Sequence, residues 1–232
     1  MSTENESIPE LLLIDKPKGI TSFTVIRKLR RELGMKKFGY AGTLDPLATG
    51  LLLVGVGPGT KKLKDLIVLD KEYVTTIMLG ESRTTDDMAG EVVEERNYES
   101  NLSRLDVETA LLRLLGEQHL PVSVYSAIKQ AGVPLYKKAY KREEGKEVDI
   151  EIPIRKMFFY ELELLNMKEE EFEGKARLFV TLRAKVSSGT YIRSLAVALG
   201  EKLGYPAVVF ELRRTKVGEY QVEDANMTVS GD

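Results

Sequence analysis

Apolar residues recur along the chain with two periods, and the change of period predicts where strands give way to helices. Leu11–Ile14 is a short apolar run typical of a strand, and Thr21 or Ser22 is suited to cap a helix that continues to about Leu33. One face of that helix is predicted to pack, and the opposite face to meet solvent. The packed set is Phe23, Ile26, Leu29 and Leu33, and the outward set is Arg27, Lys28, Arg30 and Arg31.

The rest of the chain continues as an alternation of predicted strands and helices. Strands are expected at 51–57, 71–79, 148–165 and 175–186 and again from 207, with an acidic turn at 166–174. Helices are expected up to 68, over 103–115, from Pro134 onward and up to Gly204. This order predicts an α+β fold with a mixed, mostly antiparallel central sheet flanked by helices and loops. Residues 1–9 read as a flexible tail, and 10–232 as a single domain.

A carboxylate lies in an unexpected place within Gly39–Lys61, GYAGTLDPLATGLLLVGVGPGTK. Asp45 stands among small and apolar residues, before a run that reads as a buried strand. Pro46 favours extended backbone at Asp45, and the surrounding glycines allow a ligand or another backbone segment to approach closely. Asp45 is therefore a candidate for chemistry, with a turn-forming aspartate as the alternative.

Composition limits the chemistry open to such a carboxylate. The chain has 232 residues, 43% of them hydrophobic, with zero cysteines and one histidine, His119. Thiolate nucleophiles and cysteine metal sites are excluded, and so is a metal site built from several histidines. His119 precedes Pro121 on a predicted loop, where a surface or hydrogen-bonded role is expected. No apolar run long enough for a membrane span is present, and the polar N-terminus predicts a cytoplasmic protein.

The formal net charge is −2, but basic residues are clustered around the central stretch. Such clusters bind phosphates even when the total charge is near neutral, although each alone can be a solvated face. The predicted phosphate contacts are Lys36, Lys37, Lys61, Lys62, Arg213 and Arg214.

Arg193 is a second unexpected charge. If Ser188 or Thr190 caps the following helix, Arg193 falls in its first turn, where the helix dipole disfavours a cation. We therefore expect a carboxylate partner, and Asp45 is the candidate. Such a pair would hold Asp45 ionised. The alternative is that Arg193 points into solvent.

Five ordered segments resemble the TruB family of tRNA pseudouridine-55 synthases. They are DKPKGITS, GTLDPLATGLLLVGVGPGTK, KEYVTTIMLGESRTTDDMAG, PVSVYSAIK and SSGTYIRSLAVALGEKLG, and the resemblance extends from about Leu11 to Ala225. It implies the pseudouridine synthase fold and conversion of a T-loop uridine of tRNA to pseudouridine without a cofactor. The sequence differs from the family pattern in two features. Tyr40 stands where many bacterial members have histidine, and the chain ends without the PUA-type domain that commonly follows.

The resemblance also implies roles for individual residues. Asp45 is the catalytic aspartate, acting either as a nucleophile on the sugar or as the base that removes a ribose proton. Tyr73 stacks on the target base and removes its C5 proton, and Arg193 pairs with the aspartate. The implied substrate-binding residues are Lys16, Tyr40, Tyr191 and Leu212.

The implied substrate is the T arm of tRNA, with its target nucleotide flipped out of the loop before reaction. A monomer with neither membrane attachment nor an obligate protein partner is expected. Two alternatives stay open: an RNA-binding or tRNA-folding module with little catalysis, and a synthase for T-loop-like hairpins of other RNAs.

Overall fold

The structure is a computed structural model that describes residues 8–229, so most of the tail predicted at 1–9 lies outside the described residues. The chain forms two compact units. The first ends at Val74 and resumes at Leu212, and the second is Thr75–Glu211. Two strands, β4 (Lys71–Leu79) and β12 (Ala207–Val217), have residues in each unit.

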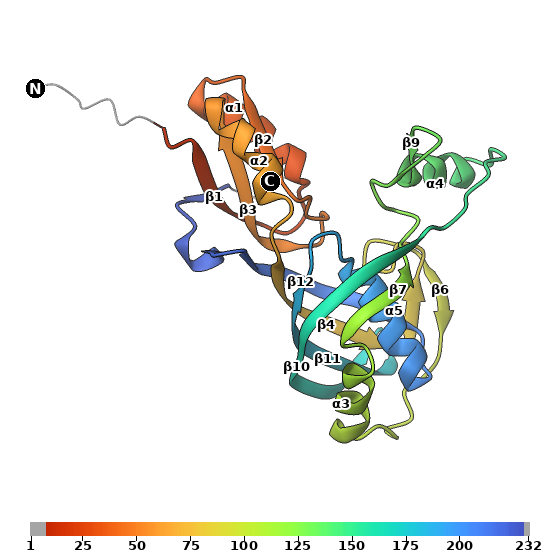
Figure 1. The fold of residues 1–232 in the computed structure, drawn as a ribbon. Helices are drawn as coiled ribbons and strands as arrows, with labels where there is room; N and C mark the ends of the chain where they lie inside the picture. Colours follow the sequence, from red (N-terminus) through yellow and green to blue (C-terminus); the bar gives the residue numbers. More distant parts are fainter. Residues whose placement is uncertain (1–7, 230–232) are drawn as a thin grey trace, which may run out of the picture. The chain divides into compact units, whose positions relative to one another are not determined.

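The first unit is a mixed sheet with the strand order β14-β1-β3-β12, in which β2 also pairs with β3 and β13 with β12. β1 and β2 run antiparallel to β3, whereas β12 runs parallel to it. In Figure 1, α1 and α2 lie beside these strands. The elements are β1 Leu11–Lys16, α1 Ser22–Leu33, β2 Phe38–Ala41, β3 Thr49–Val56, the 3-10 helix η1 Gly57–Lys62, α2 Leu63–Leu66, β13 Tyr220–Gln221, η2 Val222–Asp224 and β14 Met227–Thr228.

The second unit has the strand order β12-β4-β11-β10-β7. β10 pairs antiparallel with both β11 and β7, and two small hairpins stand outside this sheet. Figure 1 shows α4 with β9 at the end of two connecting segments, away from this sheet. The elements are β5 Glu81–Arg83, β6 Val92–Glu95, α3 Arg104–Leu112, β7 Gly116–Pro121, β8 Lys129–Gln130, β9 Val133–Pro134, α4 Leu135–Glu143, β10 Ile154–Phe172, β11 Lys175–Val186 and α5 Ile192–Leu203.

The predicted α+β class with a mixed, largely antiparallel sheet is confirmed. The buried strand after Asp45 is β3, and seven of its eight residues are buried. Its side chains Leu51 and Leu53 pack with Leu66 and Val217 in a core cluster of the first unit.

Helix α1 is capped by Thr21, one of the two predicted residues. Its packed face was predicted in part: Ile26 and Leu29 are buried and Leu33 is half-buried, but Phe23 is 54% exposed. Val25 and Lys28, which were not in the predicted packed set, are buried. The physical reason is Ser22, whose side chain forms hydrogen bonds with the backbone of Leu44. Val25 and Leu29 lie on the same face of the helix as Ser22, so this face packs against the protein and Phe23 does not.

Three element boundaries also differ from the prediction. α3 ends at Leu112 rather than 115, and His119 lies in β7 rather than on a loop. The expected acidic turn at 166–174 is mostly strand, because β10 continues to Phe172 and pairs with β11. The actual turn is Glu173–Gly174, and the positive φ angles of both residues, +52° and +75°, suit a two-residue hairpin.

Candidate active site

Asp45 lies in the loop that joins β2 to β3. The loop begins at Gly42, whose φ of +73° is readily adopted by glycine, and it ends at Ala48, whose backbone amide donates to the carbonyl oxygen of Asp45 at 3.1 Å. Asp45 is half-buried. Its backbone is therefore part of a closed turn at the edge of the buried strand β3.

The first residues of α1 hold this loop from the side. The amide of Leu44 donates to Ser22 Oγ at 2.9 Å, and Ser22 Oγ donates to the carbonyl oxygen of Leu44 at 3.1 Å. The amide of Gly19 donates to the carbonyl oxygen of Pro46 at 2.8 Å. The residues on both sides of Asp45 are thus fixed by hydrogen bonds from a segment that lies more than twenty positions earlier.

A buried lysine accompanies the carboxylate. Lys16 is 0% exposed, and its Nζ donates to the carbonyl oxygens of Pro17 and Ile20, both at 2.8 Å. Burial lowers the pKa of Lys16 to about 8, the negative charge of Asp45 opposes this decrease, and the positive charge of Arg214 adds to it. The predicted substrate-site lysine is therefore near enough to the candidate catalytic aspartate for the charge of Asp45 to raise its pKa.

Two further cations are buried in the same unit. Arg214 is 1% exposed, and its Nε and Nη2 donate to the carbonyl oxygens of Leu51 and Gly42 at 2.7 and 3.0 Å. Lys71 Nζ donates to the carbonyl oxygen of Ile67 at 2.6 Å, and burial lowers the pKa of Lys71 to about 8, with a further decrease from Arg214. The assignment of Arg214 to the exposed phosphate contacts was therefore incorrect, because its guanidinium is enclosed by backbone carbonyls.

The other predicted phosphate contacts are more accessible. Lys36, Lys37 and Lys61 are exposed, and Lys62 forms an ion pair with Glu10 at 2.9 Å while still largely exposed. Arg213 donates to both carboxylate oxygens of Asp15, at 3.0 and 2.7 Å, and keeps 42% of its side chain exposed. Their contact with RNA stays a prediction.

The remaining predicted residues of the first unit come from three strands. Tyr73 is buried in β4, on the same face as Lys71 because burial alternates along the strand. Tyr40 in β2 and Leu212 in β12 are half-buried. Leu212 is tied to β3 through its carbonyl oxygen, which accepts from Thr49 Oγ1 at 3.5 Å.

In the second unit Arg193 stands in the first turn of α5, as predicted, and it is buried. The N-cap residue is the half-buried Tyr191, so the predicted cap by Ser188 or Thr190 was wrong. The guanidinium of Arg193 donates to the carbonyl oxygens of Thr85 and Tyr125 at 3.0 and 3.1 Å. Arg193 does not point into solvent, which was the alternative considered.

The segment that receives Arg193 was missed by the sequence reasoning. Asp86 has a φ of +59°, and burial raises its pKa, while a hydrogen bond from Ser123 and the charge of Arg193 oppose that increase. Asp87 is buried and accepts from Thr85 Oγ1 at 2.6 Å and from the amide of Ala89 at 3.0 Å. The available signal was the pair of adjacent acids in TTDDMAG, a stretch that contributed to the family resemblance but was given no role of its own.

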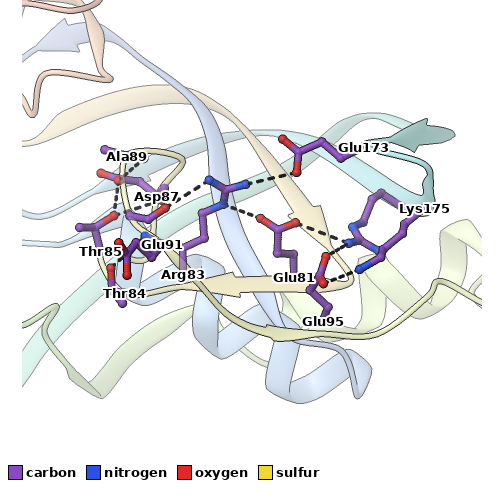
Figure 2. A network of polar contacts seen from close by, with 12 residues as sticks. Glu81, Arg83, Thr84, Thr85, Asp87, Ala89, Glu91, Glu95, Glu173 and Lys175 are labelled. Carbon is purple, nitrogen blue, oxygen red and sulfur yellow. Dashed lines mark hydrogen bonds and ion pairs between the residues drawn. The ribbon is translucent and has the colours of Figure 1, made fainter.

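A buried charge network lies beside this segment (Figure 2). Glu81 is fully buried and contacts Arg83 Nε and, at 3.5 Å, Arg177 Nη2. Arg177 is also fully buried and reaches Glu95 at 2.9 Å. Arg83 Nη1 donates to the carbonyl oxygen of Gly90 at 3.2 Å, which connects the network to the end of the segment that holds Arg193.

The predicted pair Asp45 and Arg193 joins a residue of the first unit to a residue of the second. That pairing stays a prediction. Among residues 8–229, no group of three or more His, Asp or Glu side chains is placed to hold a metal ion, and no helix is long and apolar enough to cross a membrane. His119 lies on the surface beside Glu117, 3.1 Å away, in keeping with the surface role expected for it.

Residues 30–192 match the family model described as TruB family pseudouridylate synthase (N terminal domain). The chain belongs to the TruB family. Family membership makes it a pseudouridine synthase, which is an isomerase. The matched range includes Asp45, Tyr73 and Tyr191, and Arg193 follows it directly.

Curated relatives and solved structures agree with TruB family membership. The tRNA pseudouridine synthase B of Geobacillus kaustophilus is 39% identical over 92% of this chain and 73% of its own length. That of Desulfotalea psychrophila is 42% identical over 96% of this chain and 87% of its own. A solved Cbf5-Nop10-Gar1 complex contains a chain with a TM-score of 0.66 and 25% identity. The match covers 94% of this chain but only about half, 52%, of the solved one.

Proposed function

We propose that this pseudouridine synthase isomerises the T-loop uridine of tRNA, with Asp45 as the catalytic carboxylate. The observation that carries the proposal is the loop of Asp45, which is fixed on both sides by hydrogen bonds and accompanied by the buried Lys16. The relatives named tRNA pseudouridine synthase B support tRNA as the substrate. The T-loop position rests on the family resemblance of the sequence segments.

The reaction transfers the attachment of ribose C1′ from N1 to C5 of the uracil. The bond between ribose C1′ and uracil N1 breaks, the base turns, and a bond forms between C1′ and C5. The proton on C5 is then lost and N1 gains one, so that atoms and charge balance without a cofactor. Asp45 contributes either by attacking the sugar or by removing a ribose proton, and both roles require the ionised carboxylate. The neighbouring charge of Lys16 favours that form.

The other predicted residues are proposed to hold the base. Tyr73 offers a flat ring for stacking, worth about 1–3 kcal/mol per base, and a hydroxyl near the C5 proton. Leu212, Tyr191 and Tyr40 complete the surroundings of the uracil, and Arg193 keeps Asp45 ionised. Because the reacting atoms are inside a folded loop, the nucleotide is flipped out before reaction.

The exposed cations of the first unit are proposed to contact phosphates of the T arm. Lys36, Lys37 and Lys61 are exposed, and Lys62 and Arg213 keep part of their side chains in solvent despite their acidic partners. Phosphate contacts of this kind position the RNA and carry no sequence information. We further propose that the enzyme acts as a monomer in the cytoplasm.

The test is the mapping of pseudouridine in an unmodified tRNA transcript after incubation with the wild type and with Asp45→Asn. Product at the T-loop uridine that is absent with Asp45→Asn, while tRNA binding persists, supports the proposal. Product at another uridine would refute the proposed T-loop position, while the isomerisation itself would be supported. Binding without product in the wild type would favour the RNA-binding module instead.

A further inference from the structure

We propose that Arg214 is a positioning residue for the reaction, because its guanidinium binds both the first residue of the loop that carries Asp45 and the strand that follows this loop. The inference rests on the proposed catalytic role of Asp45. Arg214 is the second arginine of the segment LRRT, and its proposed role differs from that of its neighbour Arg213. Arg213 pairs with Asp15 near the surface.

The two hydrogen bonds of Arg214 span the loop. Nη2 donates to the carbonyl oxygen of Gly42, the first residue after β2, at 3.0 Å, and Nε donates to that of Leu51 in β3 at 2.7 Å. One planar group therefore joins the first residue of the loop to the strand that leaves it, in addition to the backbone pairing of β2 with β3. A lysine has a single nitrogen and cannot reproduce this fork.

The backbone is shaped to admit the guanidinium and its strand. Arg214 pairs with Gly50, where φ is +99° and an added Cβ would lie 2.2 Å from the carbonyl oxygen of Arg214. At Gly42 an added Cβ would lie 3.2 Å from Arg214 Nη1. Glycine thus stands at one position in the loop, Gly42, and at one in β3, Gly50, where the backbone closely approaches Arg214.

A positive charge in this position is costly for stability. Arg214 is 1% exposed, and the positive charges of Lys16 and Lys71 are near enough that Arg214 lowers the pKa of both. Carbonyl oxygens accept from Nε and Nη2 but do not neutralise the charge. Because hydrophobic packing generally stabilises a core at least as well as buried charge, the arrangement points to a functional reason. The proposed reason is that the loop has to hold the carboxylate of Asp45 in place.

The expected effect is on the chemical step. Displacement of a reacting group by about 1 Å can cost about 100-fold in rate. We therefore expect Arg214→Met to lower the single-turnover rate with tRNA by about 100-fold while leaving the dissociation constant of tRNA unchanged. Arg214→Lys keeps the charge and one hydrogen bond, and its rate should lie between those of Arg214→Met and the wild type.

The control variant is Val217→Ala, which removes buried volume three positions further along β12 without touching the polar contacts. All three variants are compared with the wild type at equal folded fraction. A loss of rate confined to the Arg214 variants, with partial rescue by lysine, supports the proposal. An equal loss in Val217→Ala, or a wild-type rate in Arg214→Met, would overturn it.

A second readout does not depend on activity. Hydrogen exchange of the amides of Leu44 and Ala48 reports whether the loop is pinned, since both donate hydrogen bonds within or beside it. Faster exchange in Arg214→Met but not in Val217→Ala supports the clamp, and unchanged exchange in both refutes it. If the wild type formed no pseudouridine in any tRNA, the proposed function would fail, and this exchange measurement would still decide the role of Arg214.

Discussion

Replacing Glu81 by glutamine should destabilise the second unit far more than the same replacement at a surface pair. Glu81 is 0% exposed and contacts Arg83, which is 12% exposed (Figure 2). It also contacts the fully buried Arg177. Glu81→Gln keeps the shape of the side chain and removes its charge. Arg177 then depends on Glu95, which is 2.9 Å away and 34% exposed.

The magnitude follows from the burial of both partners. Removing one member of a buried ion pair costs about 3–5 kcal/mol, because the remaining charge is left without compensation. Since Glu95 still reaches Arg177, we expect the lower end of this range, about 3 kcal/mol in the free energy of unfolding. The control is Glu163→Gln, whose partner Arg183 is 45% exposed. It should cost about 0–1 kcal/mol.

The assay is urea denaturation of the wild type, Glu81→Gln, Glu163→Gln and the double variant Glu81→Leu with Arg177→Met. The double variant removes both buried charges and should lose less stability than Glu81→Gln alone. A decrease in the free energy of unfolding of Glu81→Gln as small as that of Glu163→Gln would refute this prediction. It would mean that the buried charge of Arg177 does not destabilise the protein when Glu81 is neutral.

Three further outcomes are expected. Gly50→Ala should destabilise the protein well beyond the ~1–3 kcal/mol of a strained backbone position, because the new Cβ would lie 2.2 Å from a carbonyl oxygen. In Gly34→Ala the new Cβ would meet nothing within 4 Å, so only the backbone strain should lower the free energy of unfolding. Urea denaturation compares the two variants. The pKa of Lys16 is lowered from 10.5 to about 8, so between pH 8 and pH 10.5 the unfolded chain binds more protons than the folded one. The free energy of unfolding should therefore rise with pH more steeply in the wild type than in Lys16→Met. Equal slopes of unfolding free energy against pH in the two proteins would contradict this. Charge reversal at Lys61 and Lys62 should weaken tRNA binding and flatten its salt dependence, and unchanged binding across a salt series would exclude both from the RNA contacts.

Local sequence signals predicted the elements that depend on neighbouring residues. The apolar run after Asp45 became β3, Thr21 capped α1, and Gly204 ended α5 with a φ of +75°. Arg193 fell in the first turn of its helix for the same reason, since the glycine turn before it limits where the helix begins.

Features set by distant partners could not be read from the sequence. The face of α1 is decided by Ser22 binding Leu44, so Phe23 is exposed although its spacing suits a core position. The acidic run of β10 is held in a strand by its pairing with β11 across a two-residue turn. Arg213 and Arg214 look alike in the sequence, and only the parallel pairing of β12 with β3 shows which of the two is buried.

Asp45 is proposed to drive the exchange of a carbon–nitrogen bond for a carbon–carbon bond at a tRNA uridine. Because that exchange removes the hydrogen on C5, a tRNA transcript carrying tritium at C5 of uridine should release one tritium per pseudouridine into water. We predict release of one equivalent per tRNA with the wild type and none with Asp45→Asn at equal tRNA occupancy. Release by Asp45→Asn at the wild-type rate would contradict the role proposed for Asp45, since the carboxylate would then not be needed for the reaction.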